Sequence, residues 1–131
     1  EGPTETLAMV PHILNADTLG VRADLISRRV TSWADLVNPA FAGRAGLVDI
    51  PAIGILDAAL ALQASGAMHY GDIGNMTRDE IDRTIDLLIG LRKRGHFASL
   101  WQRFEESVDL LASGQVVLQS MWAPAVAKVR A

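Results

Sequence analysis

The densest apolar run of the chain lies near its carboxyl terminus, between Gly114 and Pro124. A strand with one wet face alternates apolar and polar residues, whereas a parallel strand covered on both faces does not. Because the run opens with the unbroken apolar segment Val116–Leu118, we expect a buried parallel strand here, with Trp122 at its carboxyl end. Pro124 suits the first turn of a helix, so Ala123–Val129 is predicted to turn back over the sheet.

The same order of strand, proline and helix occurs earlier in the chain. Ala45–Val48 is a short apolar segment that ends at Asp49, and Pro51 opens a helical pattern that continues to Gly66. The apolar stripe predicted for this helix includes Ile53, Leu56 and Leu60. Two such units indicate a layered α/β domain with helices on both faces of the sheet.

A loop and a long helix are predicted after the second of these units. Ala67–Met76 is rich in glycine and is expected to be a surface loop. Thr77 and Glu80 have the spacing of a capping box, which marks the start of a helix that ends at Gly95. The positions that follow helical spacing in it are Ile81, Ile85, Leu88, Ile89 and Arg92.

The segment Phe97–Trp101 has two interpretations, because it fits a strand while Ser99 and Gln102 fit another capping box. Phe104–Ala112 is predicted to be helical and to end at Gly114. The inward residues expected in that helix are Val108, Leu111 and Ala112. The elements expected in the amino-terminal part are an edge strand Leu7–Leu14 interrupted by Pro11, a turn Asn15–Thr18, an extended run Leu19–Ala23, and a short helix Trp33–Val37 capped by Ser32.

Composition favours one soluble globular domain. Hydrophobic residues make up 50% and charged residues 21% of the 131 residues, which is too apolar for a disordered chain. The net charge is −3 and the basic residues are scattered, so there is no footprint for nucleic acid. The absence of cysteine excludes disulfides, thiolate metal sites and a cysteine nucleophile. No apolar run approaches the ~20 residues of a membrane span, and no segment resembles a signal peptide.

Candidate catalytic and metal-binding residues are few. His12, His69 and His96 have none of the spacings typical of zinc sites, so each is expected to be a surface or packing residue. Nucleophile elbows, phosphate loops and dinucleotide fingerprints are absent. Asp49 has two interpretations, a helix cap that complements the helix dipole or a carboxylate that faces a ligand. We therefore expect no catalytic residue, no metal site and no cofactor.

Trp122 has two interpretations as well. In open α/β sheets, ligands bind in the crevice outside the carboxyl ends of the strands, where this side chain is predicted to lie. A tryptophan beside a sheet is also commonly a packing residue. The residue type and its position leave both interpretations open.

Three segments together resemble one lobe of a known family. They are VPHILNADTLGVRADLI, VTSWADLVNPAFAGRAGLVD and LLASGQVVLQSMWAPAVAKVRA. They are similar to the second lobe of the solute-binding proteins of bacterial ABC transporters, most closely the spermidine/putrescine-binding type. The middle segment is the most specific, since T-S-W-A-D-L followed by a proline and F-x-G recurs in that family. The resemblance implies a type II periplasmic-binding-protein fold, in which residues 1–131 form a single lobe, a fragment of a two-lobed protein.

The resemblance also implies which residues face the solute. Trp122 matches the aromatic residue that packs against the methylenes of the ligand, and Ala16–Thr18 matches a cleft-facing loop between the first two strands. Asp49–Ala52 matches the strand-to-helix turn where polyamine binders place acidic residues, although Pro51 and Gly54 occupy two of those acidic positions here. The expected ligand-binding residues are Ala16, Asp17, Thr18, Asp49, Pro51, Ala52 and Trp122.

The implied function is binding of a polyamine-like or other small cationic or polar solute for uptake, without enzymatic activity. The implied partners are a membrane permease and the missing first lobe, and the implied location is the periplasm. Since Asp17 and Asp49 are the acids expected in the cleft, a solute with one cationic group is favoured unless the other lobe supplies carboxylates. Two alternatives remain, an effector-binding domain of a transcription regulator with this fold and an enzyme that uses His12 or Asp17.

Overall fold

The computed structural model describes residues 15–130, which alternate strands and helices as the sequence predicts. The elements, with η for a 3₁₀ helix, are β1 (Asp17–Val21), η1 (Trp33–Val37), η2 (Pro39–Phe41), β2 (Ala45–Val48), α1 (Pro51–Ala64), η3 (Ile73–Asn75), α2 (Arg78–Lys93), β3 (Phe97–Trp101), α3 (Phe104–Ala112), β4 (Leu118–Trp122) and α4 (Ala123–Arg130). The predicted strand Leu7–Leu14 and His12 lie outside the described residues.

The four strands form one mixed sheet in the order β1-β4-β2-β3. β2 is parallel to β3 and to β4, whereas β1 is antiparallel to β4 and lies at an edge. Parallel neighbours need a crossover connection, which α1 and α2 supply between β2 and β3. α3 connects β3 to β4, so the segment expected to be a buried parallel strand is confirmed as one relative to β2.

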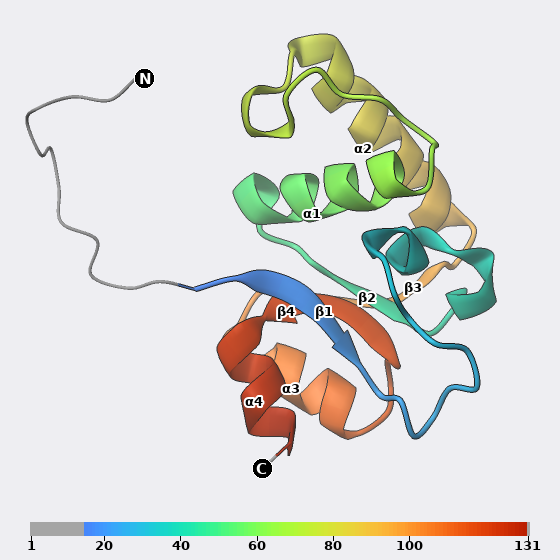
Figure 1. Ribbon diagram of the computed structural model, residues 1–131, viewed down its shortest axis with the longest axis vertical. Coiled ribbons are helices and arrows are strands. Elements are labelled where there is room, and N and C mark those ends of the chain that lie inside the picture. The colour runs from blue at the N-terminus through green and yellow to red at the C-terminus, as the bar shows by residue number, and fades with distance from the viewer. Residues whose placement is uncertain (1–14, 131) are drawn as a thin grey trace, which may run out of the picture.

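Helices cover both faces of the sheet, with α3 and α4 on one side and α1 and α2 on the other (Figure 1). Val48, Val116 and Leu118 are at most 3% exposed, as the absence of polar alternation predicts. Val116 nevertheless precedes β4, because its N–H donates to the carbonyl oxygen of Leu110 at the end of α3. The strand therefore begins two residues later than the apolar run, at Leu118.

α1 packs on the sheet through small residues, and the predicted apolar stripe is wrong for its leucines. Leu56 and Leu60 are each 37% exposed, while Ala58 and Ala61 on the packed face are buried. The reason is the close approach of α1 to β2, since a Cβ atom on Gly54 would collide with the carbonyl oxygen of Val48. No room remains on this face for a row of large side chains.

The segment Ala67–Met76 is less exposed than a surface loop. Met68 and Tyr70 are buried, and the Tyr70 hydroxyl lies 2.7 Å from Thr84 Oγ1 on α2. The hydroxyl group thus has a partner, which makes burial of the tyrosine ring favourable. The surface-loop prediction is correct for the glycines of this segment and wrong for these two side chains.

Two predicted helix starts are confirmed by hydrogen bonds between capping side chains and the backbone. Ser32 caps η1 by accepting from the N–H of Ala34, and Thr77 and Glu80 form a reciprocal capping box at the start of α2. Phe97–Trp101 is the strand β3, so the strand interpretation of that segment is correct. In α3 the residues Val108 and Leu111 are buried as expected, but Ala112 at the last position is exposed.

Candidate functional site

One edge of the sheet gathers residues from four separate segments. The parallel strands β2, β3 and β4 end at this edge, and the antiparallel strand β1 begins there. Asp17 lies directly opposite Trp122 in the β1–β4 ladder, and Asp49 follows the last residue of β2. Gln102 follows β3. We call these four residues the carboxyl edge, and a ligand of an open α/β sheet is expected to bind at such an edge.

Trp122 combines packing with exposure. Its ring is perpendicular to that of Trp101, with 5.2 Å between the ring centroids, and is nearly parallel to that of Phe104 at 6.4 Å. The side chain is only partly buried, so the packing interpretation accounts for part of its surface. The aromatic neighbours hold the indole in place at the end of β4, and contact with a ligand remains a prediction.

Asp49 is not a helix cap. Its N–H donates to the carbonyl oxygen of Trp101 at 2.7 Å, which holds it beside the end of β3. The residue at the cap position of α1 is Ile50, which makes no side-chain hydrogen bond to the helix. The exposed carboxylate of Asp49 instead accepts from Gln102 Nε2 at 3.2 Å. The cap interpretation is wrong because Asp49 lies one residue too early, and its carboxylate lies on the carboxyl edge.

Asp17 and Thr18 belong to a strand rather than to a loop. They are the first two residues of β1 and pair with Trp122 and Met121. The pairing extends to Ala16, whose carbonyl oxygen accepts from the N–H of Ala123 at 3.0 Å. Backbone groups make these bonds, so turn-favouring side chains do not prevent them. Asp17 and Ala16 are exposed and Thr18 is partly buried.

Pro51 and Ala52 form the exposed start of α1, next to Asp49. The first turn of α1 contains no acidic residue, so this end of the helix keeps its partial positive charge. Asp49 is therefore the acid beside this turn, and contact of Pro51 and Ala52 with a ligand stays a prediction. This agrees with the sparse set of acids expected from the sequence.

Asp57 is an acid at this site that the sequence analysis did not single out. It lies on the packed face of α1 and is only 2% exposed. Burial raises the pKa of its carboxyl from the ordinary 3.8 to about 7, the Ser120 hydroxyl lowers it, and the negative charge of Asp17 raises it. The signal in the sequence was a lone acid inside the apolar segment of α1.

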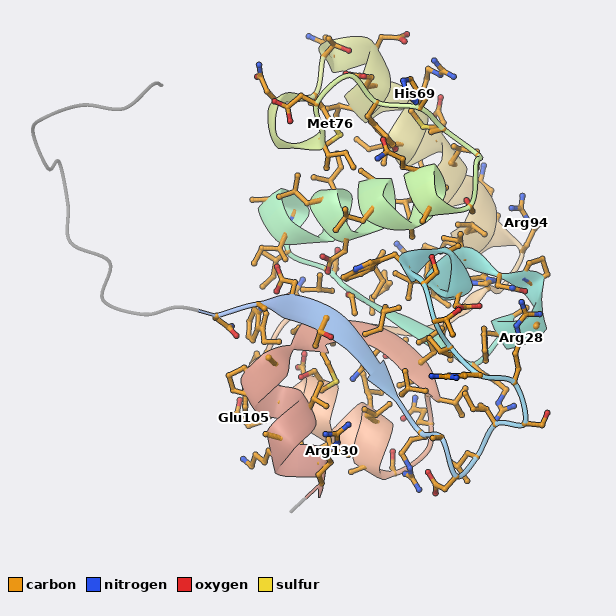
Figure 2. The ribbon with its side chains drawn as sticks, viewed as in Figure 1. Arg28, His69, Met76, Arg94, Glu105 and Arg130 are labelled. Atoms are coloured by element: carbon orange, nitrogen blue, oxygen red, sulfur yellow. The ribbon has the colours of Figure 1, made fainter. Side chains whose placement is uncertain are left out.

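Of the two histidines within residues 15–130, one packs in the core and the other lies at the surface. His96 is buried, its Nε2 lies 2.8 Å from the carbonyl oxygen of Leu36, and its ring packs edge-on against Phe97. His69 is exposed, and Figure 2 shows it beside α2, away from the sheet. Both expectations, packing and surface, are confirmed. Within residues 15–130, no three His, Asp or Glu side chains gather closely enough to hold a metal ion.

The fold is that of one lobe of a type II periplasmic-binding protein, with a mostly parallel sheet, one antiparallel edge strand and helices on both faces. The spermidine/putrescine ABC transporter substrate-binding protein PotD of Streptococcus pneumoniae, determined in complex with calcium and HEPES, is similar with a TM-score of 0.72 at 11% identity. The TpPotD lipoprotein of Treponema pallidum has a TM-score of 0.70 at 17% identity. Both similarities cover 92% of this chain and 34% of the other.

An ABC transporter protein of Clostridium perfringens has a TM-score of 0.65 at 17% identity, over 88% of this chain and 34% of its own length. The chain thus spans about a third of each solved structure. The resemblance to one lobe of the spermidine/putrescine-binding type is confirmed for the fold. No family model and no curated protein matches the sequence. Among residues 15–130, no helix combines the length and the hydrophobicity needed to cross a bilayer.

Proposed function

We propose that this chain is one lobe of a solute-binding protein that delivers a small cationic or polar solute to the membrane permease of an ABC transporter. The observation that supports this most is the carboxyl edge, where two acids and an aromatic ring come together from distant segments. The fold shared with ABC substrate-binding proteins supports the same proposal. In this proposal the protein acts in the periplasm, binds its solute together with a second lobe, and needs neither a catalytic step nor a cofactor.

The charges at the carboxyl edge suggest the class of solute. Carboxylates of Asp17 and Asp49 suit one ammonium group, and the indole of Trp122 suits an adjacent apolar stem through packing and cation–π attraction. A second buried ammonium without its own carboxylates costs several kcal/mol of lost hydration. We therefore infer a solute with one cationic group and an apolar or neutral remainder. A polyamine is expected only if the second lobe contributes further acids.

The test is calorimetric titration of the two-lobed protein that contains this chain, with butylammonium, spermidine and neutral 1-butanol as ligands. The double variant Asp17→Asn and Asp49→Asn should bind the preferred cation about 30–150-fold more weakly. At each of the two positions a charged hydrogen bond of about 1.5–3 kcal/mol becomes a neutral one of about 0.5–1.5 kcal/mol. Binding of the neutral ligand should change little. Asp86→Asn, an exposed acid on α2, is the control that changes net charge alone. Tight spermidine binding that survives the double variant would show that neither acid holds the ammonium.

A further inference from the structure

A concave region lies between α2 and the sheet; it reaches Asp49 of the carboxyl edge but is lined by neither Trp122 nor Asp17. It is a cavity of about 270 Å³ whose floor includes Leu47 and Leu100 on β2 and β3. Its opposite wall includes Ile85 and Ile89 on α2, and the start of α1 closes one side. The residues of this cavity are apolar except for Asp49 and Arg92. A concave apolar surface with few polar groups is the usual character of a small-molecule site.

The cavity exists because α2 does not lie directly on β3. α2 packs chiefly against α1, which itself covers β2 (Figure 1). Thr84 is the one fully buried residue of α2, whereas Ile85 is 42% and Ile89 is 44% exposed. Two large isoleucines therefore keep much of their surface in water at the cavity wall. Covering them with an apolar group would be favourable.

The two charged residues lie at opposite ends of the cavity. Asp49 follows the end of β2, while Arg92 lies in the last turn of α2, shortly before β3 begins. β3 begins with Phe97 opposite Ala45, the first residue of β2. Four strand residues at about 3.3 Å each separate these ends by roughly 10–13 Å. Within residues 15–130, Arg92 takes part in no salt bridge, whereas Asp49 already accepts from Gln102.

We propose that this cavity binds a small amphipathic carboxylate, with its apolar chain between α2 and the sheet and its carboxylate on the guanidinium of Arg92. A guanidinium presents a planar pair of N–H donors that matches a carboxylate. An apolar cavity of about 150 Å³ is sufficient for benzene, so this one suits a chain of about eight carbons. Asp49 and Pro51 border both this cavity and the proposed solute site, but the carboxylate contact proposed here is Arg92, which the proposed function does not use. This proposal and the proposed function therefore fail separately.

The binding test uses the 131-residue chain with labelled isoleucine methyl groups, observed by NMR during titration with butanoate, hexanoate, octanoate and decanoate. We expect saturable shifts at Ile55, Ile85 and Ile89, which line the cavity, and none at Ile26 and Ile73, which do not. Each added methylene should tighten binding about threefold to fourfold, until the chain fills the cavity near octanoate. A titration without saturable shifts at Ile85 and Ile89 would overturn the proposal.

Variants then test the role of the charge. Arg92→Gln should weaken octanoate binding about tenfold and leave 1-octanol binding unchanged, whereas Lys93→Gln, the neighbouring exposed cation, should change neither. Ile89→Glu should abolish binding of both ligands. Octylammonium that binds as tightly as octanoate would assign the cavity to a cation beside Asp49 and contradict the proposal. Self-association of the chain that Ile89→Glu abolishes would assign this face to a second copy instead.

Discussion

Replacing Asp57 by asparagine should stabilise the chain at pH 8 by about 3–4 kcal/mol. The pKa of the buried carboxyl is about 7 in the folded state and 3.8 in its ordinary surroundings. Between these values the unfolded chain has released this proton while the folded chain retains it, so the free energy of unfolding falls as pH rises. A shift of about three units corresponds to roughly 4 kcal/mol, complete once the pH exceeds the folded pKa. Asparagine has nearly the same shape and no proton to lose.

Urea unfolding of the parent chain and of Asp57→Asn at pH 5 and pH 8 measures this effect. The parent should lose stability over this interval and the variant should not. Glu80 and Glu106 do not interfere, because hydrogen bonds lower their pKa values and their contribution changes only below about pH 5. Asp109→Asn, an exposed acid on α3, should behave as the parent does. A variant no more stable than the parent at pH 8 would show that Asp57 ionises freely in the folded state.

The second large effect is expected for Gly54→Ala, which should destabilise the chain by about 2 kcal/mol. Alanine is normally the better helix former, by about 1 kcal/mol. Here its methyl group would collide with the carbonyl oxygen of Val48, a backbone atom that cannot turn aside. α1 must therefore move away from β2, and repacking of this kind costs about 1–3 kcal/mol or more. A collision with a backbone atom belongs at the upper end of this range, so about 2 kcal/mol of net destabilisation remains after the propensity gain of about 1 kcal/mol.

Gly90→Ala is the matched control, since it makes the same change in the interior of α2. The nearest atom to the new methyl group is Arg94 Nη1 at 3.3 Å, the end of a flexible side chain. This variant should be more stable than the parent by about 0.5–1 kcal/mol. Thermal unfolding followed by circular dichroism measures the stability of both variants. If Gly54→Ala and Gly90→Ala shifted the unfolding temperature equally and in the same direction, α1 would not approach β2 as closely as described.

The sequence predicts the order of the elements well and their contact faces less well. Proline after a short apolar strand located both α1 and α4, and the capping box of Thr77 located α2, because these signals act within a few residues. The packed face of α1 was missed because side-chain periodicity does not report how closely a helix approaches its neighbour. Gly54 sets that distance and leaves Leu56 in partial contact with water.

The carboxyl edge could be predicted in part. Trp122 is the last residue of β4 and Asp49 follows β2, so their place at the edge follows from the parallel direction of these two strands. Asp17 was expected in a loop, because its pairing with β4 depends on backbone groups of a segment far away in the chain. Asp57 was not expected at all, since its raised pKa comes from burial of its carboxyl in the folded chain rather than from a motif.

The most direct test of the solute site is an NMR titration that follows the indole N–H signals of the three tryptophans. Added butylammonium should shift the signal of Trp122, which lies on the carboxyl edge, in a saturable manner. The signal of Trp33 on η1 should remain in place, and that of Trp101 should move little because its Nε1 donates to the carbonyl oxygen of Ser120 at 3.1 Å. Weak binding suffices for this measurement, so it can be made on this single lobe without the second one. A saturable shift of Trp33 with an unmoved Trp122 would contradict a solute site at the carboxyl edge.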